Sequence, residues 1–289
     1  MSLTTLGHAV VAGLASGAVY AFLALPFAIA LTLTRALNLA HGELVVLGGY
    51  VGYTLAQAFG LPLAAVIPLA ALAVMPLGLA GRALLARVRE PVELNSLVLT
   101  FGLSLLLQSA TLATWSADYR LIATRPGMPA APLVLGLSHE RALAAALSLA
   151  TFAGLHLLLT RTRWGVALRA TSWDAETAAL MGVNVNRVGG ASFAVAAALA
   201  GAGGVLFAGV HYLHPLAGVE LTLLAVTLAI LGGVGRLPGL LGAGLAVWLT
   251  ESLALAWGGP RWREPLVVGL LLGALLIRPR GLGTGRVHA

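Results

Sequence analysis

The first residues of the chain that could do chemistry lie between its first two long apolar stretches. The segment Arg35-Ala-Leu-Asn38-Leu-Ala-His41-Gly42-Glu43 brings an amide, an imidazole and a carboxylate close together. Asn38 can cap a helix N-terminus, and Glu43 would fall in the first turn, where the helix dipole favours an anion. Two interpretations stay open. One is a capped helix in a loop; the other is a helix broken deep in a bundle beside a conduit, where irregular backbone needs protein or water around it.

A second unusual segment is Gly232-Gly233-Val-Gly235-Arg-Leu-Pro238-Gly239, in which glycine and proline interrupt apolar helix. Interrupted hydrophobic segments of this kind are typical of a translocation site in transporters. Glu220 and Glu251 flank apolar runs nearby; a carboxylate is costly inside a membrane and ordinary at its boundary, so a functional role for either stays open. The residues predicted to line a transport pathway are Asn38, His41, Gly42, Glu43, Gly232, Gly233 and Gly235.

The longest polar stretch of the chain runs from Thr160 to Arg187. Within it, the sequence from Asp174 to Leu180 favours a short amphipathic helix, and Gly182 with Asn184 would end that helix. Such a helix can lie in the membrane interface or dock into a partner protein. The pattern alone does not decide between these two roles.

Enzyme chemistry is not predicted. The chain has no cysteine and seven histidines, none of which forms an HExxH or similar ligand pair, so we predict no metal site, no cofactor and no catalytic residue. Ser104, Ser109 and His156 are isolated, and we expect them to serve core packing. An intramembrane enzyme would need a nucleophile paired with a base, or a set of metal ligands.

The composition explains which elements must position these residues. Of 289 residues, 59% are hydrophobic and 9% are charged, against about 25% charged in an average soluble domain. So few charges cannot cover the surface of a soluble protein, and much of this surface must face lipid. The net charge of +7 does not indicate a nucleic-acid partner, because the arginines sit in short groups between apolar runs instead of on one solvated face. We therefore predict an all-α, polytopic transmembrane bundle forming a single domain, residues 1–289.

Apolar runs give the number of membrane crossings. A bilayer core needs roughly 20 apolar residues in a helix, and the chain offers nine such runs, with eight to ten crossings as the expected range. The run 221–235 is short, and we expect it to be a half-helix. The predicted spans are 8–33, two within 44–81 separated by a turn at Gly60-Leu61-Pro62, then 94–117, 142–160, 188–219, 221–235, 240–257 and 262–278.

Arginine placement predicts the orientation, because basic loops stay in the cytoplasm. Even numbers of spans separate the three basic groups, so all three can share one side. This places the N-terminus outside, residues 161–187 in a cytoplasmic loop and the C-terminus in the cytoplasm. The basic groups are Arg82/Arg87/Arg89, Arg161/Arg163/Arg169/Arg187 and Arg278/Arg280/Arg286.

Four segments in order resemble the permease subunits of bacterial ABC importers for branched-chain amino acids. They are Leu37–Glu43 with Gly48-Gly49-Tyr50, then Arg169–Arg187, then Ala229–Gly239 with the downstream Glu251, and finally Arg278-Pro279-Arg280-Gly281-Leu282. The resemblance implies an inner-membrane subunit that translocates branched-chain or other hydrophobic amino acids. It also implies a second permease subunit, two cytoplasmic ATPase subunits and a periplasmic solute-binding protein as partners.

By the same resemblance, residues 161–187 contain the loop that couples the permease to its ATPase, and Asn38, His41 and Glu43 lie near the pathway. The chain itself has no GxxxxGK[ST] phosphate loop, in keeping with ATP hydrolysis on separate subunits. The coupling residues implied are Arg169, Asp174, Glu176, Ala178, Ala179, Leu180, Gly182, Asn184 and Arg187.

Two departures from the family leave alternatives open. The loop between Gln108 and Leu143 is short, and Gly218-Val-Glu220-Leu-Thr222 replaces a stretch that carries a lysine in the family. Closely similar permeases take up urea or short amides, which is the first alternative. An ion-coupled secondary transporter is the second; it would need relay carboxylates deep in the bundle, for which Glu43, Glu220 and Glu251 are the candidates.

Overall fold

The structure, a computed structural model, describes residues 3–34, 37–122, 139–233 and 235–258, together with the isolated positions 269, 272–273 and 276. Within these residues the fold is entirely helical, apart from one isolated backbone bridge between Arg120 and Leu213. The helices in chain order are α1 (Leu3–Thr34), α2 (His41–Phe59), α3 (Leu63–Leu85), α4 (Val92–Trp115), α5 (His139–Arg161), α6 (Arg163–Trp173), α7 (Ala175–Leu180), α8 (Val185–Ala208), the short 3₁₀ helix η1 (Pro215–Ala217), α9 (Gly218–Gly232) and α10 (Leu237–Gly258).

The predicted transmembrane bundle is confirmed. Seven helices of the described chain are long and apolar enough to cross a membrane, namely α1, α3, α4, α5, α8, α10 and the stretch Pro215–Gly232. The helix α2, of 19 residues, is more polar but lies inside the bundle with half of its length buried. The turn predicted at Gly60 is present, with a left-handed φ of 61°. The predicted span 262–278 lies outside the described residues.

One predicted span is wrong. Residues 188–219 do not form a single crossing, because α8 ends at Ala208 and the chain leaves helical geometry there. The backbone of Leu213 instead exchanges two hydrogen bonds with Arg120, of 2.9 and 2.8 Å. Pro215, which has no N–H group to donate, then opens η1 at its first position. Hydropathy misses this interruption because most residues of the loop are apolar.

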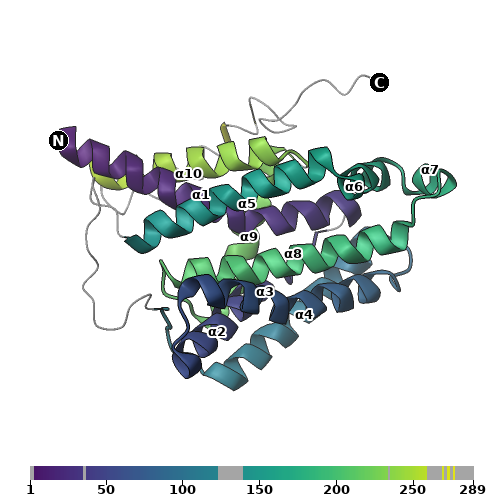
Figure 1. Cartoon of the computed structure of the whole chain (residues 1–289), viewed down its shortest axis with the longest axis horizontal. Coiled ribbons are helices and arrows are strands. Elements are labelled where there is room, and N and C mark those ends of the chain that lie inside the picture. The colour runs from purple at the N-terminus through teal and green to yellow at the C-terminus, as the bar shows by residue number, and fades with distance from the viewer. Residues whose placement is uncertain are drawn as a thin grey trace.

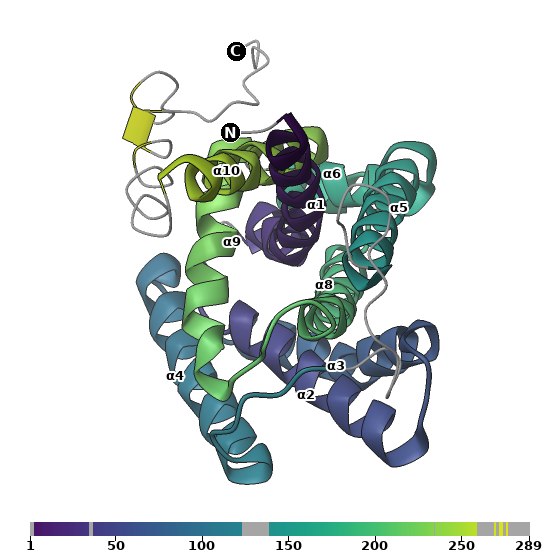
Figure 2. The same ribbon diagram turned by 90° about the vertical axis from the view of Figure 1, so that its left-hand side faces the viewer.

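The helix α9 runs across the other helices. Figure 2 shows α1, α5 and α8 nearly end-on, whereas α9 is seen from the side. Its 15 residues span about 22 Å at 1.5 Å per residue, and it reaches from the side of α2 and α4 to the side of α1 and α10. The short run 221–235, predicted as a half-helix, is thus a transverse helix that begins at Gly218.

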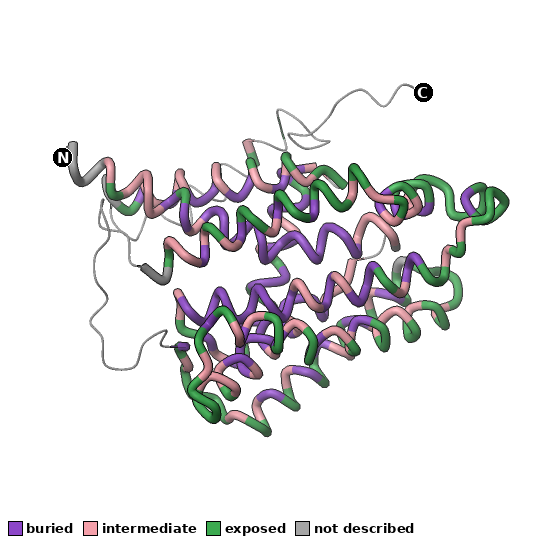
Figure 3. The backbone as a smooth tube through the Cα atoms, viewed as in Figure 1, coloured by how far each residue is buried: buried purple, intermediate pink, exposed green. Residues whose placement is uncertain are grey.

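The core lies along α1 and α8, which are buried over most of their length (Figure 3). The helix α1 packs against α5, α8, α9 and α10, and α8 packs against α1, α2 and α3. The outer helices α3, α4 and α5 expose large apolar side chains, as lipid-facing helices do. Those on α4 are Val92, Leu94, Val98, Phe101, Leu105 and Leu106.

Glycines bring the inner helices into backbone contact, because a residue without a Cβ atom lets two helix backbones approach closely. A Cβ atom on Gly48 of α2 would overlap the backbone of Gly201 of α8, and one on Gly204 would overlap the carbonyl oxygen of Val45. These contacts place α2 directly against the buried α8. The start of α2 is therefore held at a fixed depth in the bundle.

Candidate functional site

The first polar break lies deep in the bundle. The His41 Nε2 atom lies 2.9 Å from the carbonyl oxygen of Leu23, and its ring lies 5.6 Å from that of Phe27. Leu23 lies about 16 Å from the end of α1 at Thr34, at 1.5 Å per residue. The chain therefore turns back into the bundle after α1 and starts α2 beside the interior of α1. Of the two interpretations left open by the sequence, this geometry favours the helix broken at depth.

The returning turn, Leu37–Ala40, is held by α4. The Leu39 backbone N–H donates to the Thr100 hydroxyl at 3.2 Å, and Thr100 is buried. The predicted capping role of Asn38 is wrong: its side-chain oxygen accepts from the Ala40 N–H at 3.1 Å, while Ala40 occupies the N-cap position of α2 without a side-chain cap. Because α2 begins only at His41, the Asn38 side chain stabilises the turn before the helix.

Glu43 is fully buried, with 0% of its surface exposed. It lies in the first turn of α2, as predicted. The Ser104 hydroxyl of α4 donates to its Oε1 at 3.3 Å, and its Oε2 has no hydrogen-bond partner. Its carboxyl group also lies against Gly218, where a Cβ atom would overlap it. The N-termini of α2 and α9 thus meet at one carboxyl group, a position where helix dipoles favour an anion.

A hydrogen-bonded seam joins the two helices at this point. The Gly42 N–H donates to the Thr222 hydroxyl at 2.8 Å, and that hydroxyl donates to the Gly218 carbonyl at 2.9 Å. A Cβ atom on Gly42 would overlap the Gly218 carbonyl oxygen. We call the set Gly42, Glu43, Ser104, Gly218 and Thr222 the α2–α9 junction.

Sequence analysis missed three members of this junction. Ser104 was assigned to core packing, but it also binds the buried carboxylate. Gly218 and Thr222 drew notice only as a departure from the family pattern. A sequence signal for these residues exists: small residues recur four positions apart in apolar helices, as Gly218 with Thr222 and Thr100 with Ser104. Such pairs share one helix face and so can form a common contact.

The second break separates α9 from α10. Gly233 and Gly235 have φ values of 83° and 81°, a conformation that favours glycine. A Cβ atom on Gly239 would overlap the carbonyl oxygen of Gly232, so the two helix ends touch. We call Gly232–Gly239 the α9–α10 break; its Val234 lies outside the described residues.

The structure does not gather all predicted pathway residues into one site. Gly42 and Glu43 of α2 lie against the start of α9, His41 precedes them beside α1, and Asn38 lies in the turn before α2. Gly232, Gly233 and Gly235 lie at the other end of α9. The two predicted groups are therefore connected by one transverse helix.

The helices α6 and α7 form one end of the molecule, and α7 projects farthest from the bundle (Figure 1). We call Arg163–Met181 the α6–α7 end. Asp174 caps α7, since its Oδ1 accepts from the N–H groups of Glu176 and Thr177 at 3.0 Å each. The short helix predicted here is confirmed, with Ala178 buried and Ala179 exposed.

The tip of this end is apolar and open. Trp173, Leu180 and Met181 are 77%, 83% and 81% exposed. Gly182, with a φ of 86°, ends α7 as predicted. Asn184 does not; its side-chain oxygen accepts from the Arg187 N–H at 3.0 Å and so caps the following helix α8.

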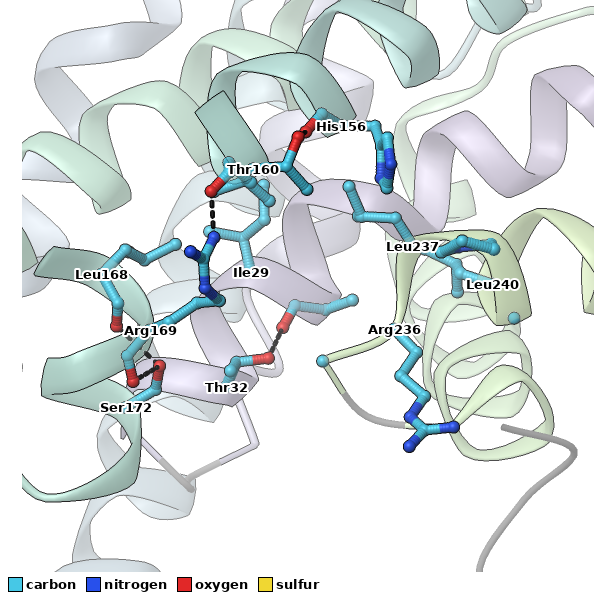
Figure 4. A pocket seen from close by; sticks show the side chains of 15 residues that line it. Ile29, Thr32, His156, Thr160, Leu168, Arg169, Ser172, Arg236, Leu237 and Leu240 are labelled. Carbon is cyan, nitrogen blue, oxygen red and sulfur yellow. Dashed lines mark hydrogen bonds between the residues drawn. The ribbon is translucent and has the colours of Figure 1, made fainter. Parts of the chain in front are cut away.

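A cavity of about 640 Å³ connects the α6–α7 end to the α9–α10 break. The Arg169 guanidinium donates to the carbonyl oxygen of Leu159. Figure 4 shows Arg169 on one side of this cavity and Arg236 on the other, with Thr32 of α1 between them. Gly235 lines the same cavity close to Thr32. A residue predicted for coupling and one predicted for the pathway thus face a shared space.

Comparison with known proteins gives consistent matches over nearly the whole chain. Residues 9–277 match a family model described as the permease component of the branched-chain amino acid transport system. The permease protein BraD of the high-affinity branched-chain amino acid transport system of Pseudomonas aeruginosa is 29% identical, over 93% of both chains. The corresponding permease LivH of Escherichia coli is 28% identical, over 93% of this chain and 92% of its own.

A solved structure, PsaBC from Streptococcus pneumoniae in complex with Fab, aligns with 96% of this chain and 91% of its own. The TM-score is 0.47 and the sequence identity is 15%. This likeness is too distant to support a conclusion about the chain.

Proposed function

Because the chain belongs to the family of branched-chain amino acid transport system permease components, we propose that it is the membrane-spanning subunit of an ATP-binding-cassette importer. Its cargo is branched-chain or other hydrophobic amino acids, carried across the bacterial inner membrane. The family match over residues 9–277 is the observation that carries this proposal. It favours amino acids over urea or short amides, and an ATP-driven importer over an ion-coupled transporter.

The chain works with partners in this proposal. A second permease subunit completes the pathway, two cytoplasmic ATPase subunits supply the energy, and a periplasmic binding protein delivers the solute. The N-terminus faces outward, and the α6–α7 end and the C-terminus face the cytoplasm. The exposed apolar tip with Trp173, Leu180 and Met181 suits docking into a groove of an ATPase, because buried apolar anchors dominate binding energy at interfaces.

The cavity shared by Arg169 and Gly235 suggests how motion reaches the membrane. A displacement of α6 changes the shape of this cavity, and α1, which packs against α6, α9 and α10, passes the displacement to the α9–α10 break, where two glycines with positive φ allow a hinge. The helix α9 then carries the movement to the α2–α9 junction. His41, Gly42 and Glu43, with Asn38 in the preceding turn, form the part of the pathway at that depth.

Reconstitution tests the function. Proteoliposomes containing the chain, a partner permease and the ATPases are supplied with the binding protein and labelled leucine. We expect leucine accumulation that requires ATP and stops when the ATPase subunits are omitted. Leucine transport by the chain down an ion gradient, with no ATPase present, would overturn the proposal.

A further inference from the structure

A smaller cavity, of about 190 Å³, lies at the end of the bundle that carries α6 and α7 (Figure 1). Residues of α3, α4, α6 and α8 line it, and it shares none of them with the α2–α9 junction or with the cavity that Arg169 lines. We call it the α3–α6 cavity. Whole small-molecule ligands usually occupy roughly 300–1,000 Å³, so this space suits a small group or one end of a larger molecule.

The charge in the α3–α6 cavity comes from Arg82, in the last turn of α3. Its guanidinium lies against α8, where a Cβ atom on Gly189 would be 2.9 Å from Nε. Arg82 is half-buried, and its guanidinium makes no hydrogen bond or ion pair within the described part of the chain. Among the described side chains that line the cavity, none is acidic. The cavity therefore holds a positive charge that no neighbour of known position neutralises.

A buried hydroxyl group without a partner lines the same cavity. Thr171 of α6 is 7% exposed, and its Oγ1 atom has no hydrogen-bond partner. Other buried hydroxyls of the bundle, such as those of Thr111 and Ser192, donate to the carbonyl oxygen four residues earlier. A buried polar atom left unpaired is costly, and a ligand that accepts from it removes that cost.

The donors of this cavity match a phosphate group. Besides Arg82 and Thr171, the buried Ser96 of α4 lines the cavity, so donors come from three helices. A carboxylate presents its two oxygens in one plane, whereas the oxygens of a phosphate point in several directions and can accept from all three. Charge-assisted hydrogen bonds from arginine to phosphate are strong. Val185, the first residue of α8, also lines the cavity, and a helix N-terminus favours an anion.

The surroundings of the cavity place it at a membrane boundary. Arg82 lies near the end of α3, which is long and apolar enough to cross a membrane. Leu79 and Leu84, on the neighbouring turns of α3, are exposed, and so is Val92 at the start of α4. A lipid whose headgroup enters the cavity can lay its acyl chains along these apolar side chains. Basic pockets between membrane helices on the cytoplasmic side bind anionic lipid headgroups.

We propose that the α3–α6 cavity binds the phosphate group of an anionic membrane lipid. Arg82 binds the phosphate oxygens, and the hydroxyl groups of Thr171 and Ser96 donate to them. The bound headgroup links α3, α4 and α6, and so holds the α6–α7 end against the bundle. This inference goes beyond the proposed function, because it concerns a lipid and not the cargo; only the choice of the cytoplasmic leaflet rests on the proposed orientation.

Native mass spectrometry tests the lipid site directly. The chain, purified with its partner subunits in detergent, receives phosphatidylglycerol, phosphatidylcholine or inorganic phosphate at equal concentrations, and the bound molecules are counted. We expect phosphatidylglycerol to bind about tenfold more tightly than phosphatidylcholine, whose trimethylammonium group Arg82 repels. Inorganic phosphate that displaces phosphatidylglycerol from this site at equal concentration would identify a soluble phosphate as the ligand and overturn the lipid site.

Two variants separate ligand binding from a structural role. Arg82→Gln should weaken phosphatidylglycerol binding about tenfold, because a charged hydrogen bond is lost. Thr171→Val keeps the shape of the side chain and removes the unpaired hydroxyl group, and it should weaken binding about fivefold. The matched controls are Arg87→Gln, at an exposed position after α3, and Thr111→Val, whose hydroxyl already has a partner. Both controls should bind the lipid as the wild type does.

The outcomes are distinguishable from failure of the proposed function. Lipid binding that neither Arg82→Gln nor Thr171→Val changes overturns the lipid site. Arg82→Gln that loses the ATPase subunits but keeps the lipid would assign Arg82 to a carboxylate of the ATPase, and would overturn the lipid site as well. Leucine import is measured separately: a preparation that binds phosphatidylglycerol as expected but imports no branched-chain amino acid overturns the proposed function and leaves the lipid site standing.

Discussion

The α2–α9 junction and the α6–α7 end differ in almost every physical respect. At the junction, Glu43 is fully buried and glycine backbones leave no room for a Cβ atom. At the α6–α7 end, Leu180 and Met181 are more than four-fifths exposed, and few other elements contact α7. Close packing transmits displacement because it does not deform continuously, whereas an exposed apolar tip is suited to binding. The comparison suits two different roles: the α6–α7 end receives the force from the ATPase, and the α2–α9 junction responds to it.

The largest expected effect comes from filling the junction. Gly218→Val would force side-chain atoms into the Glu43 carboxyl group, and overpacking costs about 1–3 kcal/mol or more. We expect loss of folded protein, measured as monodisperse material on size exclusion and as a lowered Tm in detergent. Gly102→Val on α4 is the matched control, because nothing lies within 4 Å of a Cβ atom there. Equal stability of the two variants would show that the junction is loosely packed.

A charge on the exposed tip should break coupling and leave the fold intact. Leu180 is the most exposed large apolar side chain of α7. In Leu180→Asp, docking onto the ATPase would have to remove a charged carboxylate from water. We expect co-purification with the ATPase subunits to fall at least about tenfold, since a truncated interface anchor costs about 2 kcal/mol or more. Leu180→Met keeps an apolar tip and should bind as the wild type does. Undiminished binding of the Asp variant would mean that the ATPase docks elsewhere.

Removing the buried carboxyl group should affect transport more than stability. Glu43→Gln keeps the shape and the hydrogen bond from Ser104 but can no longer carry a negative charge beside the two helix N-termini, where an anion gains about 0.3–1 kcal/mol per helix. We expect leucine import to fall about tenfold at an unchanged amount of folded protein. Glu220→Gln, at an exposed position in the first turn of α9, should import normally. Normal import by both variants would remove Glu43 from the pathway.

The smallest expected effect tests whether α7 acts as a rigid helix. Asp174→Ala removes the cap that accepts from Glu176 and Thr177, at a cost of about 1 kcal/mol. Amide hydrogen exchange of residues 175–180 should then be about fivefold faster, and ATPase stimulation by the binding protein should weaken. Asp174→Asn retains a capping oxygen and should restore both. Exchange that does not change would show that α7 is held by other contacts.

Sequence reasoning succeeded where composition and spacing carry the information. Long apolar runs predicted the bundle, Gly60 predicted a turn, and Asp174 with Gly182 bounded α7. It failed where distant segments decide the geometry. Nothing in a window of sequence shows that Ser104 meets Glu43, or that Thr222 meets Gly42, because these pairs lie 61 and 180 positions apart.

The direction of a helix axis is the other property that the sequence does not supply. Hydropathy measures how apolar a segment is but not how its axis lies, so the short run 221–235 predicted a half-helix and not the transverse path of α9. Asn184 illustrates the same limit at short range. A capping residue between two helices suits either one, and only the fold shows that Asn184 accepts a hydrogen bond from the Arg187 N–H of α8.

Single-cysteine accessibility tests most directly whether the α6–α7 end lies in the cytoplasm, where an ATPase subunit could dock onto it. The sequence contains no cysteine, so Glu176→Cys and Asp118→Cys each introduce one thiol, at opposite ends of the bundle. Spheroplasts are treated with a membrane-impermeant maleimide before or after permeabilisation. We predict that the cysteine at position 118 is labelled in intact spheroplasts and that the one at position 176 reacts only after permeabilisation. Labelling of position 176 in intact spheroplasts, with protection of position 118, would contradict docking of a cytoplasmic ATPase at the α6–α7 end.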